Sequence, residues 1–120
     1  MTEIPKQKYD LEERTAKFGE NIIKFAKLIP RNTTTIPLIS QLVRSGTSIG
    51  SNYCEADCAE SKKDFVHKLG ICKKEAKETK HWLRMINTAI QDLEDEIIKL
   101  TKEANELRFI FLAIIKKSTQ

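Results

Sequence analysis

The sequence predicts an all-α fold, an antiparallel up-down-up-down four-helix bundle formed by a single domain over residues 1–120. Its 120 residues include only four Gly and three Pro, fewer turn residues than a sheet protein needs. Charged residues make up 32% of the chain, and apolar residues recur every three or four positions in four long segments. A chain of this length is the size of one domain and can bury one core.

The first expected helix covers about residues 10–29. Asp10 and Glu13 form a capping box, in which Asp10 accepts a hydrogen bond from a helix N–H group and Glu13 reaches back. Pro30 ends the segment, because it cannot continue the helical hydrogen bonds. Residues at spacings of three and four form the inward face: Leu11, Thr15, Phe18, Ile22, Phe25 and Ile29.

The second expected helix covers about residues 35–60. We expect Thr34 or Thr35 to cap its start, with Pro37 tolerated in the first turn. Gly46 and Gly50 each cost a helix interior about 1 kcal/mol relative to Ala, and close approach of a neighbouring helix is the simplest explanation. The inward face comprises Leu38, Leu42, Gly46, Ile49, Tyr53 and Ala56.

The third and fourth expected helices cover about residues 62–91 and 94–117. Ser61, followed three residues later by Asp64, is typical of a helix start. The acidic residues from Asp92 to Glu96 favour another start, because the helix dipole attracts negative charge there. The two inward faces comprise Phe65, Leu69, Cys72, Ala76, Leu83 and Ile90, and Ile97, Leu100, Ala104, Leu107, Phe111 and Ile114.

Positive charge is concentrated in the third expected helix. Residues 62–84 contain eight Lys or Arg and three acidic residues, a net charge of +5 in a chain whose total is +4. Such a basic segment favours a polyanionic partner, although Lys-rich faces also serve solubility alone. At about 100° per residue, five of these cations form one line, which we call the basic stripe: Lys62, Lys73, Lys77, Lys80 and Arg84.

The opposite flank of this helix carries a second, partly apolar stripe that includes Ile71, Trp82 and Met85. One interpretation is a subunit interface, in which Glu75 and Glu78 take Arg or Lys partners from a neighbouring subunit. The other is that Trp82 lies across a groove within one bundle. We favour the interface.

Arg44 and Glu55 of the second expected helix project in similar directions but lie three helical turns apart. Each either pairs with a residue of another helix, with Glu75 or Arg84 as the first candidates, or stays solvated. The expected oligomer interface therefore comprises Arg44, Glu55, Ile71, Glu75, Glu78, Trp82 and Met85.

Other site chemistries find little support in the sequence. Cys54 and Cys58 lie one helical turn apart, but without a second pair they make a weak zinc site. A di-iron bundle needs Glu-x-x-His on two helices, and Glu78 and His81 supply one such pair only. No catalytic Ser-His arrangement or phosphate-binding Gly loop is recognisable. We expect no enzymatic activity, no cofactor and no metal, and a cytoplasmic protein with reduced thiols and no membrane span.

Two stretches of the sequence, RSGTSIGSNYCEA and AESKKDFVHKLGICKKEAKETKHWLRMI, resemble the four-helix-bundle proteins encoded in 23S ribosomal RNA intervening sequences. The first stretch fits the family pattern at Arg44, Ser45, Ser48, Ile49, Asn52, Glu55 and Ala56. The second fits it at Ser61, Lys62, Asp64, Phe65, Lys74, Glu75, Ala76, Glu78, Thr79 and Trp82. Gly50 and Ala56 stand where many members have Pro and Gly.

The resemblance implies a homopentameric ring of bundles, similar to the accessory protein of diversity-generating retroelements. That protein has a basic surface and works with a reverse transcriptase and nucleic acid. The resemblance does not imply an enzymatic activity.

Two functions follow as hypotheses. In the first, a non-enzymatic homo-oligomer binds the backbone of RNA or DNA through the basic stripe, with little sequence preference and strong salt dependence. In the second, the protein is a scaffold or adaptor for another protein, such as a reverse transcriptase, and the Lys residues keep it soluble. Charge reversal at Lys73, Lys77 and Lys80 distinguishes them, because only the first requires these charges.

Overall fold

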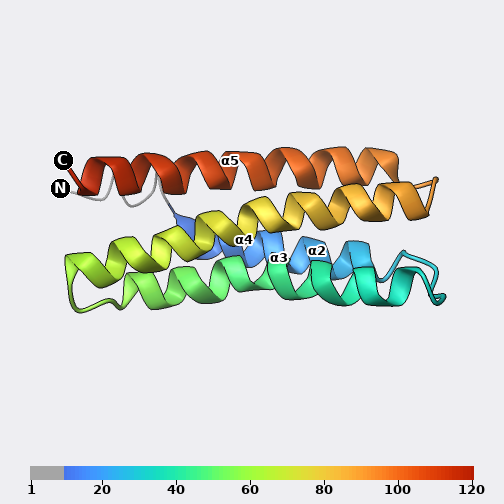
Figure 1. The fold of residues 1–120 in the computed structure, drawn as a ribbon, viewed down its shortest axis with the longest axis horizontal. Coiled ribbons are helices and arrows are strands. Elements are labelled where there is room, and N and C mark those ends of the chain that lie inside the picture. The colour runs from blue at the N-terminus through green and yellow to red at the C-terminus, as the bar shows by residue number, and fades with distance from the viewer. Residues whose placement is uncertain (1–9) are drawn as a thin grey trace.

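A computed structural model of the chain describes residues 10–120. It contains four α-helices and, in this part of the chain, no β-strand. The helices are α2 (Leu11–Ala26), α3 (Thr35–Asp57), α4 (Lys62–Ala89) and α5 (Glu94–Ser118) (Figure 1). The all-α fold class and the four helical segments are confirmed.

Three of the helices end before the expected residue, and α5 ends one residue later. Helix α2 ends at Ala26 rather than residue 29, because Leu28 and Ile29 donate to the carbonyls three residues back, at 2.9 and 3.2 Å. Helix α3 ends at Asp57 rather than residue 60, where Ala59 makes the same tighter bond to Ala56. Helix α4 ends at Ala89 rather than residue 91, because the backbone of the next residue is extended.

Side chains cap the starts of the first three helices, two of them as expected. Asp10 accepts from the Glu13 N–H group at 3.3 Å, and Ser61 accepts from the Asp64 N–H group at 3.0 Å. The expected Thr cap of α3 is wrong. The Asn32 side-chain oxygen accepts from the N–H groups of both Thr34 and Thr35, each at 2.9 Å, and so fills that role.

The Thr35 side chain is buried and holds the α2–α3 connection instead. Its hydroxyl donates to the Pro30 carbonyl at 2.6 Å and accepts from the Asn32 N–H group at 3.0 Å. The side chains of Asn32 and Thr35 therefore hold the α2–α3 connection against the start of α3.

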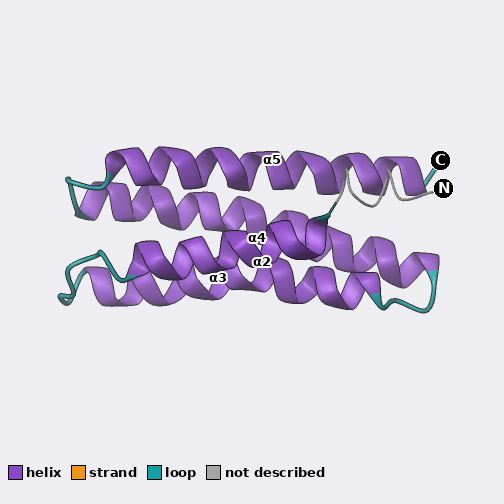
Figure 2. Ribbon diagram, turned by 180° about the vertical axis from the view of Figure 1, so that it is seen from behind, coloured by secondary structure: helices purple, strands orange, loops and turns teal. Residues whose placement is uncertain are grey.

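The helices pack in chain order. Helix α3 contacts α2 and α4, α4 contacts α5, and a much smaller contact between α2 and α5 closes the bundle. The α2–α3 and α4–α5 connections lie at one end, and the α3–α4 connection lies at the other end with the C-terminus (Figures 1 and 2). The result is an elongated bundle of 49 × 24 × 20 Å.

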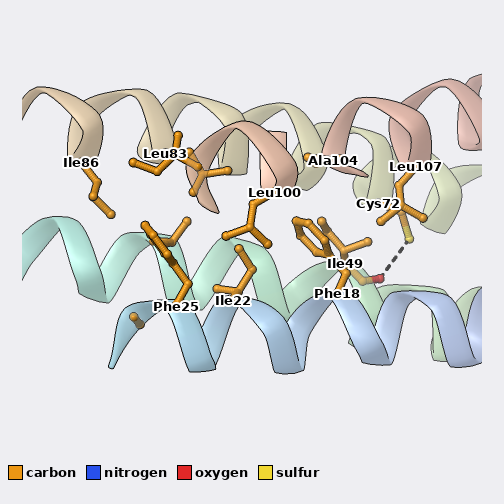
Figure 3. Close-up of a cluster of buried hydrophobic side chains, with 14 of the residues drawn as sticks. Phe18, Ile22, Phe25, Ile49, Cys72, Leu83, Ile86, Leu100, Ala104 and Leu107 are labelled. Carbon is orange, nitrogen blue, oxygen red and sulfur yellow. Dashed lines mark hydrogen bonds between the residues drawn. The ribbon is translucent and has the colours of Figure 1, made fainter. Parts of the chain in front are cut away.

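All four helices contribute side chains to one core, part of which is shown in Figure 3. All six expected inward residues of α2 are buried, as are most of those expected on the other helices. The expected positions that are only half-buried are Leu38, Tyr53, Phe65, Ile90 and Ile114. Buried positions outside the expected faces include Ala26, Thr35, Ile39, Ser45, Thr79 and Ile86.

Close approach of α2 and α3 at Gly46 is confirmed. A Cβ atom added there would lie 2.8 and 2.9 Å from the γ-carbons of Ile22, a fully buried side chain. At Gly50 an added Cβ would lie 3.4 Å from the Thr15 hydroxyl oxygen, at the edge of ordinary contact. The contacts therefore favour glycine more strongly at Gly46 than at Gly50.

Candidate nucleic-acid interface

The basic stripe follows one line along α4. Its last four members, Lys73, Lys77, Lys80 and Arg84, are spaced by four, three and four residues on an unbroken helix. At 1.5 Å per residue they span about 16 Å. Lys77 and Arg84 are exposed, and the other two are half-exposed. The structure thus brings these four cations onto one accessible surface.

Lys62 lies at the start of the same line, beside the end of α5. One surface hollow is lined by Lys62, Lys63 and Val66 of α4 together with Ser118 and Thr119. The flank of α4 that carries the stripe is therefore the one next to α5, and the other flank packs on α3.

The two carboxylates of α4 that lie between Lys73 and Lys80 in sequence, Glu75 and Glu78, lie on the α3 side. The Arg44 guanidinium contacts both of them: one nitrogen lies 3.3 Å from the two Glu75 carboxylate oxygens, and another binds Glu78. The Trp82 indole N–H also donates to Glu78, at 3.1 Å. This indole hydrogen bond, followed by that from Arg44, lowers the pKa of Glu78. Both carboxylates are therefore held on the flank opposite the stripe.

Two further sets of ion pairs give surface carboxylates a cation from a neighbouring helix. Lys68 of α4 binds Glu55 of α3 at 2.6 Å, and this hydrogen bond raises the pKa of Lys68. Arg14 of α2 binds Glu103 and Glu106 of α5 at 2.8 and 2.9 Å, and its pKa is raised chiefly by Glu103. Sequence reasoning missed the Arg14 cluster, because the partners lie 89 and 92 residues from Arg14 in the chain.

None of the five stripe cations takes part in an ion pair with any residue between 10 and 120. Ion pairing in the bundle is confined to the α2–α5 and α3–α4 seams, so the flank of α4 next to α5 keeps its positive charge. Lys side chains in this arrangement can contact successive phosphates without reading base identity.

The residues of the expected oligomer interface lie along the α3–α4 seam. The pairing of Arg44 with Glu75 is confirmed, whereas Glu55 pairs with Lys68 and not with Arg84. Glu75 and Glu78 do not depend on a neighbouring subunit for a cation, because Arg44 of the same chain supplies it. That part of the interface interpretation is wrong.

The apolar members of the expected interface, Ile71, Trp82 and Met85, are half-buried. Trp82 packs against the core, and its ring meets that of His81 edge-to-face with centroids 4.8 Å apart. This contact with the core fits the alternative in which Trp82 lies over a groove within one bundle. A subunit contact through the remaining exposed surface stays a prediction.

The motif RSGTSIGSNYCEA forms much of the α3–α4 contact. Ser45 is fully buried, and its hydroxyl is hydrogen-bonded to the Thr79 hydroxyl at 3.0 Å. Thr79 also donates to the Glu75 carbonyl at 2.8 Å. This buried polar pair fixes the register of α3 against α4 beneath the Arg44 ion pairs.

The cysteines occupy two environments. Cys54 and Cys58 are exposed, and Cys72 is buried with its thiol 3.5 Å from the Ile49 carbonyl (Figure 3). Burial raises the pKa of Cys72 to about 12.

Residues 10–120 contain no group of three His, Cys, Asp or Glu side chains placed to hold a metal. Over the same residues no helix is long and apolar enough to cross a membrane.

Comparison with known proteins places this geometry in a family. Residues 7–112 match the family described as 23S rRNA-intervening sequence protein. The fold is also similar to the crystal structure of a protein of unknown function from the S23 ribosomal protein family of Bacteroides thetaiotaomicron. The two chains are 30% identical with a TM-score of 0.80, and the similarity covers 88% of this chain and 97% of that one. A comparison with curated proteins finds no match. The chain belongs to the 23S rRNA intervening sequence protein family.

Proposed function

We propose that the protein is a non-enzymatic homo-oligomer that binds the sugar-phosphate backbone of RNA or DNA through the basic stripe of α4. The separation of charge carries this proposal: the stripe cations have no ion-pair partner within residues 10–120, while Arg44 holds the neighbouring carboxylates on the opposite flank. Binding of this kind releases counterions and tolerates many sequences. The ribosomal family name of the relative agrees with an RNA partner.

The oligomer is proposed as a pentameric ring of antiparallel up-down-up-down bundles. Support for the topology comes from the connections, which lie at alternating ends of the bundle. A ring would repeat the stripe in every subunit and so compensate for the modest net charge of +4 per chain. Arg44 and Glu78, both partly exposed, remain accessible to a neighbouring subunit.

The proposal assigns the protein no enzymatic activity, cofactor or metal, and a cytoplasmic location. The described chain offers a charged surface and a closed core, and phosphate contacts require neither a nucleophile nor a general base.

A scaffold or adaptor that binds another protein, such as a reverse transcriptase, is the second candidate. The observation in its favour is the set of large apolar side chains exposed outside the stripe: Ile23, Leu28, Ile36, Ile98, Phe109 and Leu112.

Charge reversal tests the main proposal. We expect a variant with Glu at Lys73, Lys77 and Lys80 to lose binding to a fluorescein-labelled RNA hairpin in fluorescence anisotropy at low salt. The matched control carries Glu at Lys17, Lys24 and Lys99, three exposed lysines of α2 and α5 that change net charge equally. We expect the control to keep most of its affinity. Equal losses in both variants would show a response to net charge alone and would refute a localised interface.

A further inference from the structure

The outer face of α5 carries an exposed aromatic ring among cations. Phe109 is 56% exposed, and the Arg108 guanidinium carbon lies over its ring, 5.5 Å from the centroid. Lys102 and Lys116 lie seven residues before and after Phe109, so they share its face, and both are exposed. The ring borders an apolar hollow with Leu11 of α2, Tyr53 of α3 and Phe65 of α4, yet more than half of the residue stays exposed.

Carboxylates are held away from this face. Glu103 and Glu106 both bind Arg14 on the side of α5 that meets α2. From residue 107 to 118 the helix carries three cations and no acidic residue. The nearest carboxylate in sequence, Glu106, is paired with Arg14, so the unpaired charges of α5 around Phe109 are positive.

This surface adjoins the flank of α4 that bears the basic stripe. The end of α5 and the start of α4 line one hollow, with Ser118 and Thr119 on one side and Lys62 on the other. Helices α4 and α5 also pack against each other, and their ribbons separate toward the start of α4 (Figures 1 and 2). A strand bound along the stripe would therefore lie on the helix that packs directly against α5.

We propose that Phe109, with the guanidinium of Arg108, forms a stacking platform for an unpaired base, and that the partner is single-stranded nucleic acid or a single-stranded loop. This inference rests on the nucleic-acid binding proposed above. Bases in a duplex are stacked on each other and cannot reach a helix surface, whereas unpaired bases stack on aromatic rings and on guanidinium planes. The lysines contact the backbone, and Phe109 distinguishes single strands from duplexes.

A second copy of the chain is the competing occupant of this surface. Two such faces in contact would bring Lys102, Arg108 and Lys116 of one copy against those of the other. Like charges disfavour that contact, and Lys is depleted in interface cores. Charge complementarity therefore favours a polyanion with aromatic bases.

The test compares an oligo(U) RNA with an RNA duplex of the same length, by fluorescence anisotropy on the full chain. Stacking on one aromatic side chain predicts that Phe109→Ala lowers oligo(U) affinity roughly 5- to 100-fold. Affinity for the duplex should stay unchanged. The slope of log K against log salt should also stay unchanged, because no phosphate contact is lost. Phe109→Trp should retain oligo(U) binding, and Ile98→Ala, at an equally exposed apolar residue of α5, should behave as the wild type.

Each outcome is decisive. Unchanged oligo(U) affinity in Phe109→Ala, or equal losses for oligo(U) and duplex, would overturn the platform and leave the stripe standing. A Phe109→Ala variant that changes oligomer mass by native mass spectrometry, with affinity unaltered, would assign Phe109 to a subunit contact and also overturn the platform. Failure of the wild type to bind either RNA at low salt would overturn the proposed function itself.

Discussion

Gly46→Ala tests the packing of α3 on α2. The new Cβ would lie 2.8 and 2.9 Å from carbons of Ile22, whose side chain is fully buried and cannot move into solvent. Overpacking of a core costs about 1–3 kcal/mol, and Gly to Ala in a helix gains about 1 kcal/mol. We therefore expect a net change between no effect and a loss of about 2 kcal/mol.

Gly70→Ala is the matched control, since an added Cβ there meets no atom within 4 Å. It should stabilise the protein by up to about 1 kcal/mol through helix propensity alone. The difference between the two variants isolates the packing cost, expected at about 1–3 kcal/mol. Urea unfolding followed by circular dichroism measures both, at several protein concentrations, because oligomerisation contributes to stability. If Gly46→Ala stabilises as much as Gly70→Ala, the close contact between α2 and α3 does not exist.

Three further predictions address the caps and titratable groups. Because Asn32 caps α3, Asn32→Ala should lower the free energy of unfolding in urea by about 1 kcal/mol, and Thr34→Ala should lower it much less. A larger loss in Thr34→Ala than in Asn32→Ala would show that Thr34 is the cap. Ellman's reagent should modify two thiols of the native protein quickly and Cys72 only in urea, and three equally fast thiols would contradict its burial. Glu78 has a lowered pKa in the folded state, so its stabilising effect is present above the ordinary value of 4.5 and is lost as pH falls below it. The free energy of unfolding of Glu78→Gln should therefore fall less than that of the wild type as the pH is lowered. Identical pH profiles would contradict the contacts of Glu78 with Trp82 and Arg44.

Helical periodicity in the sequence was sufficient to predict the core. On α2, Phe18, Ile22 and Phe25 repeat at the spacing of one helix face, and all are buried. The ends were less predictable, because α2 and α3 finish in tighter turns whose hydrogen bonds leave no mark on apolar spacing. Asn32 was missed as a cap because its side chain reaches forward across a turn that precedes the helix.

The charged contacts depended on which helices meet. Arg44 and Glu75 lie on facing flanks of adjacent helices, so a helical wheel was enough to suggest their pairing. Glu55 and Lys68 face each other only because α3 and α4 pack close to their connection, a detail that no wheel contains. The surface around Phe109 was missed because only those apolar residues of α5 that repeat at the inward spacing were considered. The position of Phe109 outside that repeat was the signal that it is exposed.

The salt dependence of RNA binding tests the central claim most directly. The association constant of the wild type for oligo(U) should fall steeply with salt, with a slope of log K against log salt that reports the number of phosphate contacts. Each neutralising change, Lys73→Gln, Lys77→Gln or Lys80→Gln, should make that slope shallower by about 0.7. Lys24→Gln, on α2, should leave it unchanged. A slope that does not respond to the stripe lysines, or no binding at low salt, would contradict the assignment of α4 as a nucleic-acid interface.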